Sequence, residues 1–248
     1  MYRRKRRRNY RAQRPYQITR YRIPNVLNPD ELIMKIKFND IVSIDPANAT
    51  TRIIYPVNGS RLSELTRTTN FASNAAKFRQ VEFLSGKLSF YIINQGFGRL
   101  SSLGIPSYLM IGMHTIRRWY DEDLTAQTET VISQPTNFNN MWQGSSETQG
   151  YSIRLVNTIT SGKGIQKLAF KGSKSSFKTL KANPTGFQEN LPLPTTDPDR
   201  VFPANSMEAH VDLCFISDGN AATETAQNTV VLVSRTILVR FKGARNYV

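Results

Sequence analysis

Alternation of apolar and polar residues is the feature of this chain that most restricts its fold. After residue 30, apolar residues alternate with polar ones or form short β-branched and aromatic runs, which Gly, Pro, Asn, Asp and Ser separate. This pattern is typical of β-strands, because successive side chains of a strand point to opposite faces. The sequence therefore predicts an all-β fold with about eight strands, at residues 32–44, 52–57, 78–93, 107–119, 151–159, 164–170, 207–216 and 229–241.

Two of these segments say more about the sheets. In residues 229–241 almost every second side chain is apolar, with Arg235 as the exception, which is typical of a long strand at the centre of a sheet. In residues 78–93 the apolar positions change parity at Ser85 and Gly86. Because one extra residue moves all later side chains to the other face, we expect a β-bulge at Gly86.

The segments between the strands differ in character. Leu62 and Leu65 are spaced as in a helix, and Ser60 is a suitable N-cap, so one or two short helices are expected within residues 58–77. Residues 121–149 and 182–205 are long, polar and rich in Pro, Asn, Thr and Ser. We expect loops of the kind that contact other molecules.

The amino-terminal segment has a different composition from the rest. Its 22 residues hold ten of the 33 basic residues and no acidic residue, whereas residues 23–248 hold 23 basic and 18 acidic residues. Repulsion and low apolar content prevent such a segment from forming a core, so residues 1–22 are predicted to be a disordered arm and residues 23–248 one folded domain. The basic residues of the arm are Arg3, Arg4, Lys5, Arg6, Arg7, Arg8, Arg11, Arg14, Arg20 and Arg22.

Nucleic acid is the partner that fits this arm best. Each Arg can neutralise a phosphate without a fixed geometry, and four interspersed tyrosines can stack on unpaired bases. The run Arg3–Arg8 also satisfies a nuclear import signal, which requires an import receptor as a partner. A solvated tail that binds acidic surfaces weakly is the remaining alternative.

A second basic group contains six lysines within 19 residues. It is a candidate polyanion patch, either for packaged nucleic acid on an inner surface or for a sulfated cell-surface glycan on an outer one. The alternative is a solvated strand edge, since lysines prevent edge-to-edge aggregation. Its members are Lys163, Lys167, Lys171, Lys174, Lys178 and Lys181.

No catalytic or metal-binding constellation is recognisable. His114 and His210, the only histidines, lie in expected strands among apolar residues, so we expect them to be buried or half-buried in the core. Cys214 lies in an apolar run and is interpreted as a small buried hydrophobic residue. No His or Cys cluster has metal-ligand spacing. We therefore expect no enzymatic activity, no metal site and no cofactor.

Membrane insertion is not expected either. No uninterrupted apolar stretch approaches the ~20 residues that a membrane-spanning helix needs. The basic amino terminus is not followed by the apolar segment of a secretory signal. The chain is therefore expected to be intracellular when made.

Taken as a whole, the chain resembles the capsid proteins of circoviruses and related small circular single-stranded DNA viruses. The most specific features are the arginine-rich arm, the strand containing Phe78-Arg-Gln-Val-Glu-Phe83 after a short helical segment, and Arg240-Phe-Lys-Gly243 in the last strand. The basic block ends at Arg22, whereas many circovirus arms continue through a second long arginine tract.

This resemblance implies a single eight-stranded jelly-roll sandwich, sixty copies of which close into a T=1 icosahedral shell. The arms would point inward and bind single-stranded DNA, and the protein would occur in the virion and the host nucleus. The alternative is a non-assembling nucleic-acid-binding protein with a basic tail. Because the basic excess lies mainly in the tail and not on a folded surface, the composition favours the container.

Overall fold

Long antiparallel strands dominate the computed structural model, which describes residues 30–44, 50–94, 108–120, 126–147, 150–157, 165–177, 184–194, 196–216 and 229–245. The first sheet has the order β1 (Glu31–Ser43), β12 (Thr229–Ala244), β4 (Phe78–Asn94) and β8 (Ile165–Ser173), and β9 (Gln188–Asn190) also pairs with β4. In the second sheet, β2 (Thr50–Pro56) pairs with β11 (Ser206–Ile216), which pairs with β5 (Tyr108–Tyr120). Both β6 (Ala126–Thr128) and β7 (Ser152–Asn157) pair with β5, and β3 (Ser60–Arg61) pairs with β10 (Val201–Phe202).

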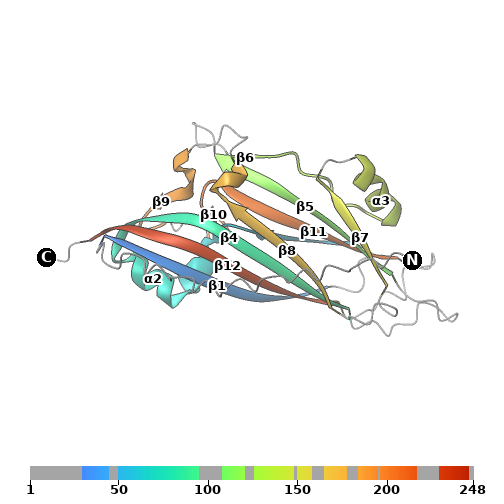
Figure 1. The fold of residues 1–248 in the computed structure, drawn as a ribbon, viewed down its shortest axis with the longest axis horizontal. Helices are drawn as coiled ribbons and strands as arrows, with labels where there is room; N and C mark the ends of the chain where they lie inside the picture. Colours follow the sequence, from blue (N-terminus) through green and yellow to red (C-terminus); the bar gives the residue numbers. More distant parts are fainter. Residues whose placement is uncertain are drawn as a thin grey trace, which may run out of the picture.

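The eight longer strands form a jelly roll. The orders β1-β12-β4-β8 and β2-β11-β5-β7 place successive strands in alternate sheets at nearly every connection, and all pairs are antiparallel (Figure 1). The all-β prediction is confirmed, and each expected strand is found with described ends within three residues of those expected. The last strand is central, as predicted, because β12 lies between β1 and β4. The arm, residues 1–22, lies outside the described residues.

The main core lies between the two sheets. Apolar side chains at every second position of β4 and β12 pack against those of β5 and β11. This alternation arises because each strand of a sandwich buries one face and exposes the other. This cluster contains Leu88, Phe90, Ile92, Val231 and Val233 from the first sheet, and Leu109, Ile111, Ala209, Val211 and Leu213 from the second.

Two short helices, α1 (Leu62–Arg67) and α2 (Thr69–Ala75), cover the end of the first sheet near the carboxyl terminus (Figure 1). Leu65 and Phe71 pack there against Phe241 and other inner-face residues. The helices were predicted, but the N-cap was not: Arg61 occupies that position, and Ser60 belongs to β3. Ser60 Oγ instead donates a hydrogen bond to Glu64 at 2.6 Å, so it still ties the first turn down.

The predicted β-bulge is present, but it lies two residues before Gly86, the expected position. Phe83 pairs with Val239 and Ser85 with Leu238, which leaves Leu84 as the extra residue of β4. Gly86 has another role. A Cβ there would lie 1.9 Å from the carbonyl oxygen of Val57, so only glycine lets the chain after β2 cross the inner face of β4 this closely.

The two expected long loops contain more regular structure than predicted. Residues 121–149 hold β6 and a helix, α3 (Phe138–Glu147), while residues 182–205 hold β9, β10 and a 3₁₀ turn, Pro184–Phe187. Met141 of α3 is buried with Tyr151 and Cys214 on the outer face of the second sheet. Helix α3 therefore covers a face that would otherwise be exposed.

Candidate nucleic-acid interface

Four lysines lie close together on the outer face of the first sheet. On β1, Ile36 is buried between Lys35 and Lys37, and on β4 the core residue Leu88 follows Lys87, so strand alternation places these lysines outward. The sheet register aligns Lys37 with Thr236 of β12, Thr236 with Lys87, and Lys87 with Lys171 of β8. We call Lys35, Lys37, Lys87 and Lys171 the lysine belt.

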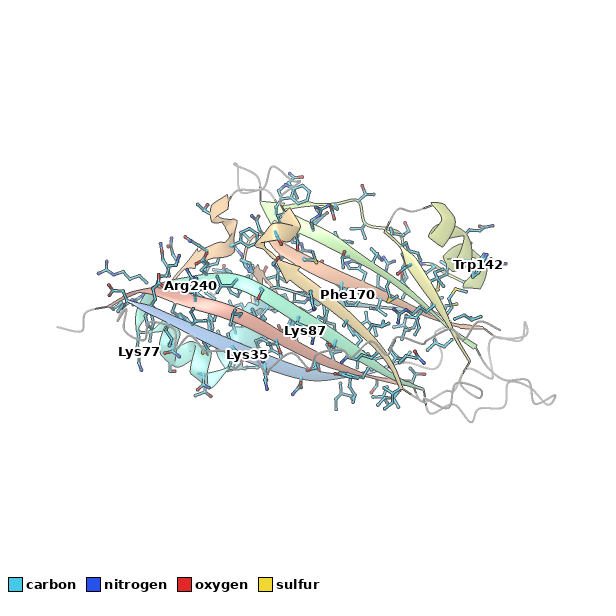
Figure 2. All side chains as sticks on the ribbon, in the orientation of Figure 1. Lys35, Lys77, Lys87, Trp142, Phe170 and Arg240 are labelled. Carbon is cyan, nitrogen blue, oxygen red and sulfur yellow. The ribbon has the colours of Figure 1, made fainter. Side chains whose placement is uncertain are left out.

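The belt lies around a shallow hollow. Three belt lysines line it, Lys35, Lys87 and Lys171, together with Leu238, two glycines and the short side chains of Ser85, Ser173 and Thr236. Figure 2 shows Lys35 and Lys87 on neighbouring parts of this sheet. Strands lie ~4.8 Å apart, so the belt concentrates positive charge across the width of the sheet.

The belt lysines have no acidic partner among the residues that the structure describes. Each of the four is exposed, and none makes a salt bridge there. The cations near the start of β1 are different: Lys242 Nζ lies 2.8 Å and Arg240 Nη1 3.7 Å from the buried carboxylate of Glu82. The uncompensated charge of this face therefore lies at the belt and at Lys167 of β8, where a polyanion can neutralise it.

The predicted lysine cluster is only partly placed by the structure. Lys167 and Lys171 are exposed on β8, whereas Lys163, Lys178 and Lys181, and the side chain of Lys174, lie outside the described residues. Strand β8 is at the edge of its sheet, as the solvated-edge alternative requires. That alternative does not explain why Lys171 aligns with Lys87 and Lys37, an alignment that is not evident from the sequence. Alternation within β1 and β4 marks both as outward, but their alignment depends on sheet register.

The arm precedes β1 in the sequence. Its basic residues, Arg3 to Arg22, are outside the described part, and the first described strand after them is β1, the edge strand that contributes Lys35 and Lys37.

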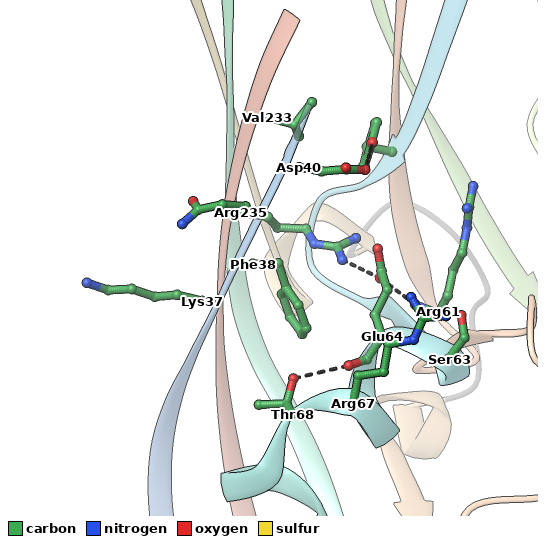
Figure 3. Close-up of a pocket in the computed structure, with 12 residues that line it drawn as sticks. Lys37, Phe38, Asp40, Arg61, Ser63, Glu64, Arg67, Thr68, Val233 and Arg235 are labelled. Carbon is green, nitrogen blue, oxygen red and sulfur yellow. Dashed lines mark hydrogen bonds and ion pairs between the residues drawn. The ribbon is translucent and has the colours of Figure 1, made fainter. Parts of the chain in front are cut away.

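A pocket beside the belt is lined by an internal ion pair, Arg235 with Glu64. Arg235, 2% exposed, points from β12 to the inner side, where its guanidinium contacts the carboxylate of Glu64 and lies 4.7 Å from the Phe38 ring centroid. Burial alone would raise the pKa of Glu64, but the Arg235 charge and hydrogen bonds from Ser60 and Arg235 hold that pKa below its ordinary value. Figure 3 shows Lys37 on the opposite side of β1 from Arg235. The pocket is therefore part of the framework that holds α1 on the sheet.

The two histidines are buried, as predicted. They face each other across β5 and β11, with ring centroids 4.8 Å apart. Burial, with the neighbouring charges of His210 and Arg52, lowers the pKa of His114 to about 4. Arg52 is itself engaged with Asp212, at 2.7 Å from Nε to Oδ1. This cluster is internal to the covered face of the second sheet.

Cys214 is also buried, and its burial raises the pKa of the thiol to about 11, which is opposite to what a nucleophile needs. Within the described ranges, no group of three or more His, Cys, Asp and Glu side chains is arranged to hold a metal ion. No helix of the described part is long and apolar enough to cross a membrane.

Solved structures with a similar fold exist, but the sequence matches no known protein family. No protein-family model matches the sequence, and no curated protein sequence does. A structure of turnip yellow mosaic virus is 11% identical, with 90% of this chain and 87% of that chain covered and a TM-score of 0.39.

Two further structures are similar to the same extent. A decameric BFDV capsid protein is 9% identical over 86% of this chain and 99% of its own, with a TM-score of 0.39. A mud crab tombus-like virus is 10% identical over 87% and 83%, with a TM-score of 0.39. At these identities and TM-scores the likeness carries no conclusion about function.

Proposed function

We propose that the chain is a viral capsid protein that assembles into a small icosahedral shell and packages a nucleic-acid genome. The observation that carries this proposal is a group of cations on one sheet of a jelly roll, the sheet whose edge strand follows the arginine-rich arm in the sequence. Lysines with no acidic partner among the described residues lie across the outer face of the first sheet, and the arm precedes β1 of that sheet. In a shell, this sheet would face the genome.

The physical logic is that of a container. A jelly roll limits exposed strand edges by closing two sheets on each other, and viral capsids are one class of proteins that use it. Loops outside the sandwich would make weak contacts between subunits. Nucleic acid bound by the arms raises the local concentration of subunits, which favours closure of the shell.

The finer features follow from the resemblance in sequence plan. We infer a single-stranded DNA genome, sixty subunits, and entry of the protein into the host nucleus through an import receptor that binds the arm. Sixty arms would supply roughly 600 positive charges, enough to neutralise much of a small genome without reading its sequence.

Packaging can be tested by removing each group of cations separately. Deletion of residues 1–22 should leave a folded protein that has lost most of its bound nucleic acid. The triple variant Lys35→Gln, Lys87→Gln, Lys171→Gln should keep the arm but lower the slope of log affinity against log salt by about 2, since each contact to a single strand contributes about 0.7. Binding of a labelled oligonucleotide at several salt concentrations measures both effects.

A matched control separates the belt from general charge. Arg67, Lys77 and Arg79 are exposed and lie outside the belt, and Figure 2 shows Lys77 away from Lys87. Their replacement by Gln removes the same net charge and should leave the salt slope unchanged. Equal losses in both triple variants would refute a role for the belt, and unchanged retention of single-stranded DNA after arm deletion would refute the role of the arm.

A further inference from the structure

An exposed apolar patch lies on the same outer face as the lysine belt. Ile41, Ile165 and Leu232 are 67%, 54% and 36% exposed. The register joins them across the sheet: Ile41 aligns with Leu232, Leu232 with Tyr91, and Ile165 with Ile93, two residues beyond Tyr91 on β4. We call Ile41, Leu232, Tyr91, Ile93 and Ile165 the apolar patch, in which Tyr91 and Ile93 are half-buried. Exposed apolar patches of this kind mark interaction surfaces.

Between belt and patch lies a row of short polar or small side chains. It contains Asn39, Ser234, Ser89 and Ala169, aligned across β1, β12, β4 and β8. Successive outward rows are two residues, or ~6.7 Å, apart along a strand, so the belt and Tyr91 are separated by roughly 13 Å. The face thus changes from cationic, through short and polar, to apolar and aromatic.

This order matches the order of groups in an unpaired nucleotide: phosphate, sugar and base. We propose that the outer face of the first sheet binds single-stranded nucleic acid, with phosphates on the lysine belt and a base stacked at Tyr91. The inference rests on the proposed function and extends it. It states that the folded domain, and not only the arm, recognises single-stranded nucleic acid. A duplex can satisfy the belt alone, since its bases are paired inside the helix.

The charges around Tyr91 favour this occupant over protein. Lys167 Nζ lies over the Tyr91 ring, 5.3 Å from its centroid, so a cation already contacts one face of the aromatic group and a base would stack on the other. The outward positions from the Lys35 row to the Ile165 row hold four belt lysines and Lys167 but no acid. The arm of the same chain carries like charge and is repelled. A second copy docked here would have to bring acidic groups to offset five cations.

Photocrosslinking tests this directly. The full-length protein is irradiated with a bromouracil-substituted single-stranded oligonucleotide, digested with trypsin and examined by mass spectrometry. We expect an adduct on the peptide 88–99, which contains Tyr91, and none on it with a duplex of the same sequence. Tyr91→Phe keeps the ring and should keep the adduct, whereas Tyr91→Ala should reduce its yield roughly tenfold, in line with the loss of one stacked base.

Other outcomes overturn the inference without touching the proposed function. Adducts confined to arm peptides would mean that the arm alone binds unpaired bases. An equal yield on peptide 88–99 from duplex and single strand would mean that strandedness is not recognised here. The double variant Ile41→Ser, Ile165→Ser tests whether the patch is a contact between copies. It is such a contact if the double variant no longer self-associates and if adducts form on arm peptides but not on peptide 88–99. Packaging, the nucleic-acid part of the proposed function, fails if neither the arm nor the sheet yields adducts, whereas shell closure is tested separately by particle size.

Discussion

Arg235 is the residue whose position the alternating pattern explains least, because it takes a core position on a central strand. The structure compensates its charge: the guanidinium contacts Glu64 of α1 and donates to Ser60 Oγ at 3.2 Å. Removal of one partner of a buried pair is costly because the other charge remains buried without compensation. The sequence marks Arg235 as an exception, but its partner lies 171 residues away and could not be identified without the fold.

The pair predicts the effect of truncating Glu64. Glu64→Ala should destabilise the protein by about 3 kcal/mol, the lower end for a buried pair because the Glu64 side chain is 25% exposed. Glu64→Gln retains an acceptor and should cost less, about 1–2 kcal/mol. Urea unfolding measures both, and a Glu64→Ala variant within roughly 0.5 kcal/mol of the wild type would contradict this account.

His114 makes stability depend on pH. Its pKa in the folded protein, about 4, lies below the ordinary value of 6.5, so the unfolded chain takes up the proton first. Stability from this residue is complete above pH ~6.5 and is lost as the pH falls toward 4. Between pH 7 and pH 5 the wild type should lose about 2 kcal/mol more than His114→Gln, as measured by urea unfolding at the two pH values. Parallel losses would show that His114 does not contribute.

At the scale of elements, the periodicity of apolar residues was sufficient to predict the long strands. It was insufficient to predict helix α3 and the lysine belt. Strands such as 78–93 and 229–241 carry many alternating positions, so their existence and centrality follow from the sequence. Helix α3 was not predicted because it has few large apolar residues, so no helical periodicity is visible in its sequence. Its buried residue Met141 packs against the second sheet, a contact that only the fold creates. The lysine belt was missed because its members come from three strands that only the register aligns. The role of the arm stays a prediction.

Two glycines differ in what an added methyl group would meet. Gly86 packs closely against backbone from another part of the fold, whereas Gly144 has open space around it. Gly86→Ala would place a Cβ 1.9 Å from backbone, so it should destabilise the protein by more than about 3 kcal/mol or prevent folding. Gly144 of α3 has nothing within 4 Å of an added Cβ, and Gly144→Ala should stabilise the helix by about 0.5–1 kcal/mol. Thermal unfolding of both variants tests the close crossing of β4 by the chain after β2. A Gly86→Ala protein as stable as the wild type would rule that crossing out.

At the scale of the whole molecule, the basic residues that can bind nucleic acid are divided between the arm and the folded body. Ten of the basic residues precede residue 23, and the body adds a belt on the sheet to which they connect. Arginine can contact phosphate through two parallel hydrogen bonds, whereas lysine acts as a point charge.

Replacement of all arm arginines by lysine keeps the charge and removes this geometry. We expect particles that still package nucleic acid, because counterion release depends on charge, but with lower retention at high salt. The nucleic-acid content of purified particles after a high-salt wash measures the difference. A complete loss of packaging already at low salt would show that charge alone is insufficient.

The proposed function requires this chain to form a closed shell around nucleic acid. Closure can be tested by size-exclusion chromatography of the full-length protein with light scattering, recorded at nucleic-acid and protein wavelengths. We expect a single megadalton species rich in nucleic acid. A peak at one or a few chains, with or without nucleic acid, would contradict it and would support a non-assembling nucleic-acid-binding protein with a basic tail.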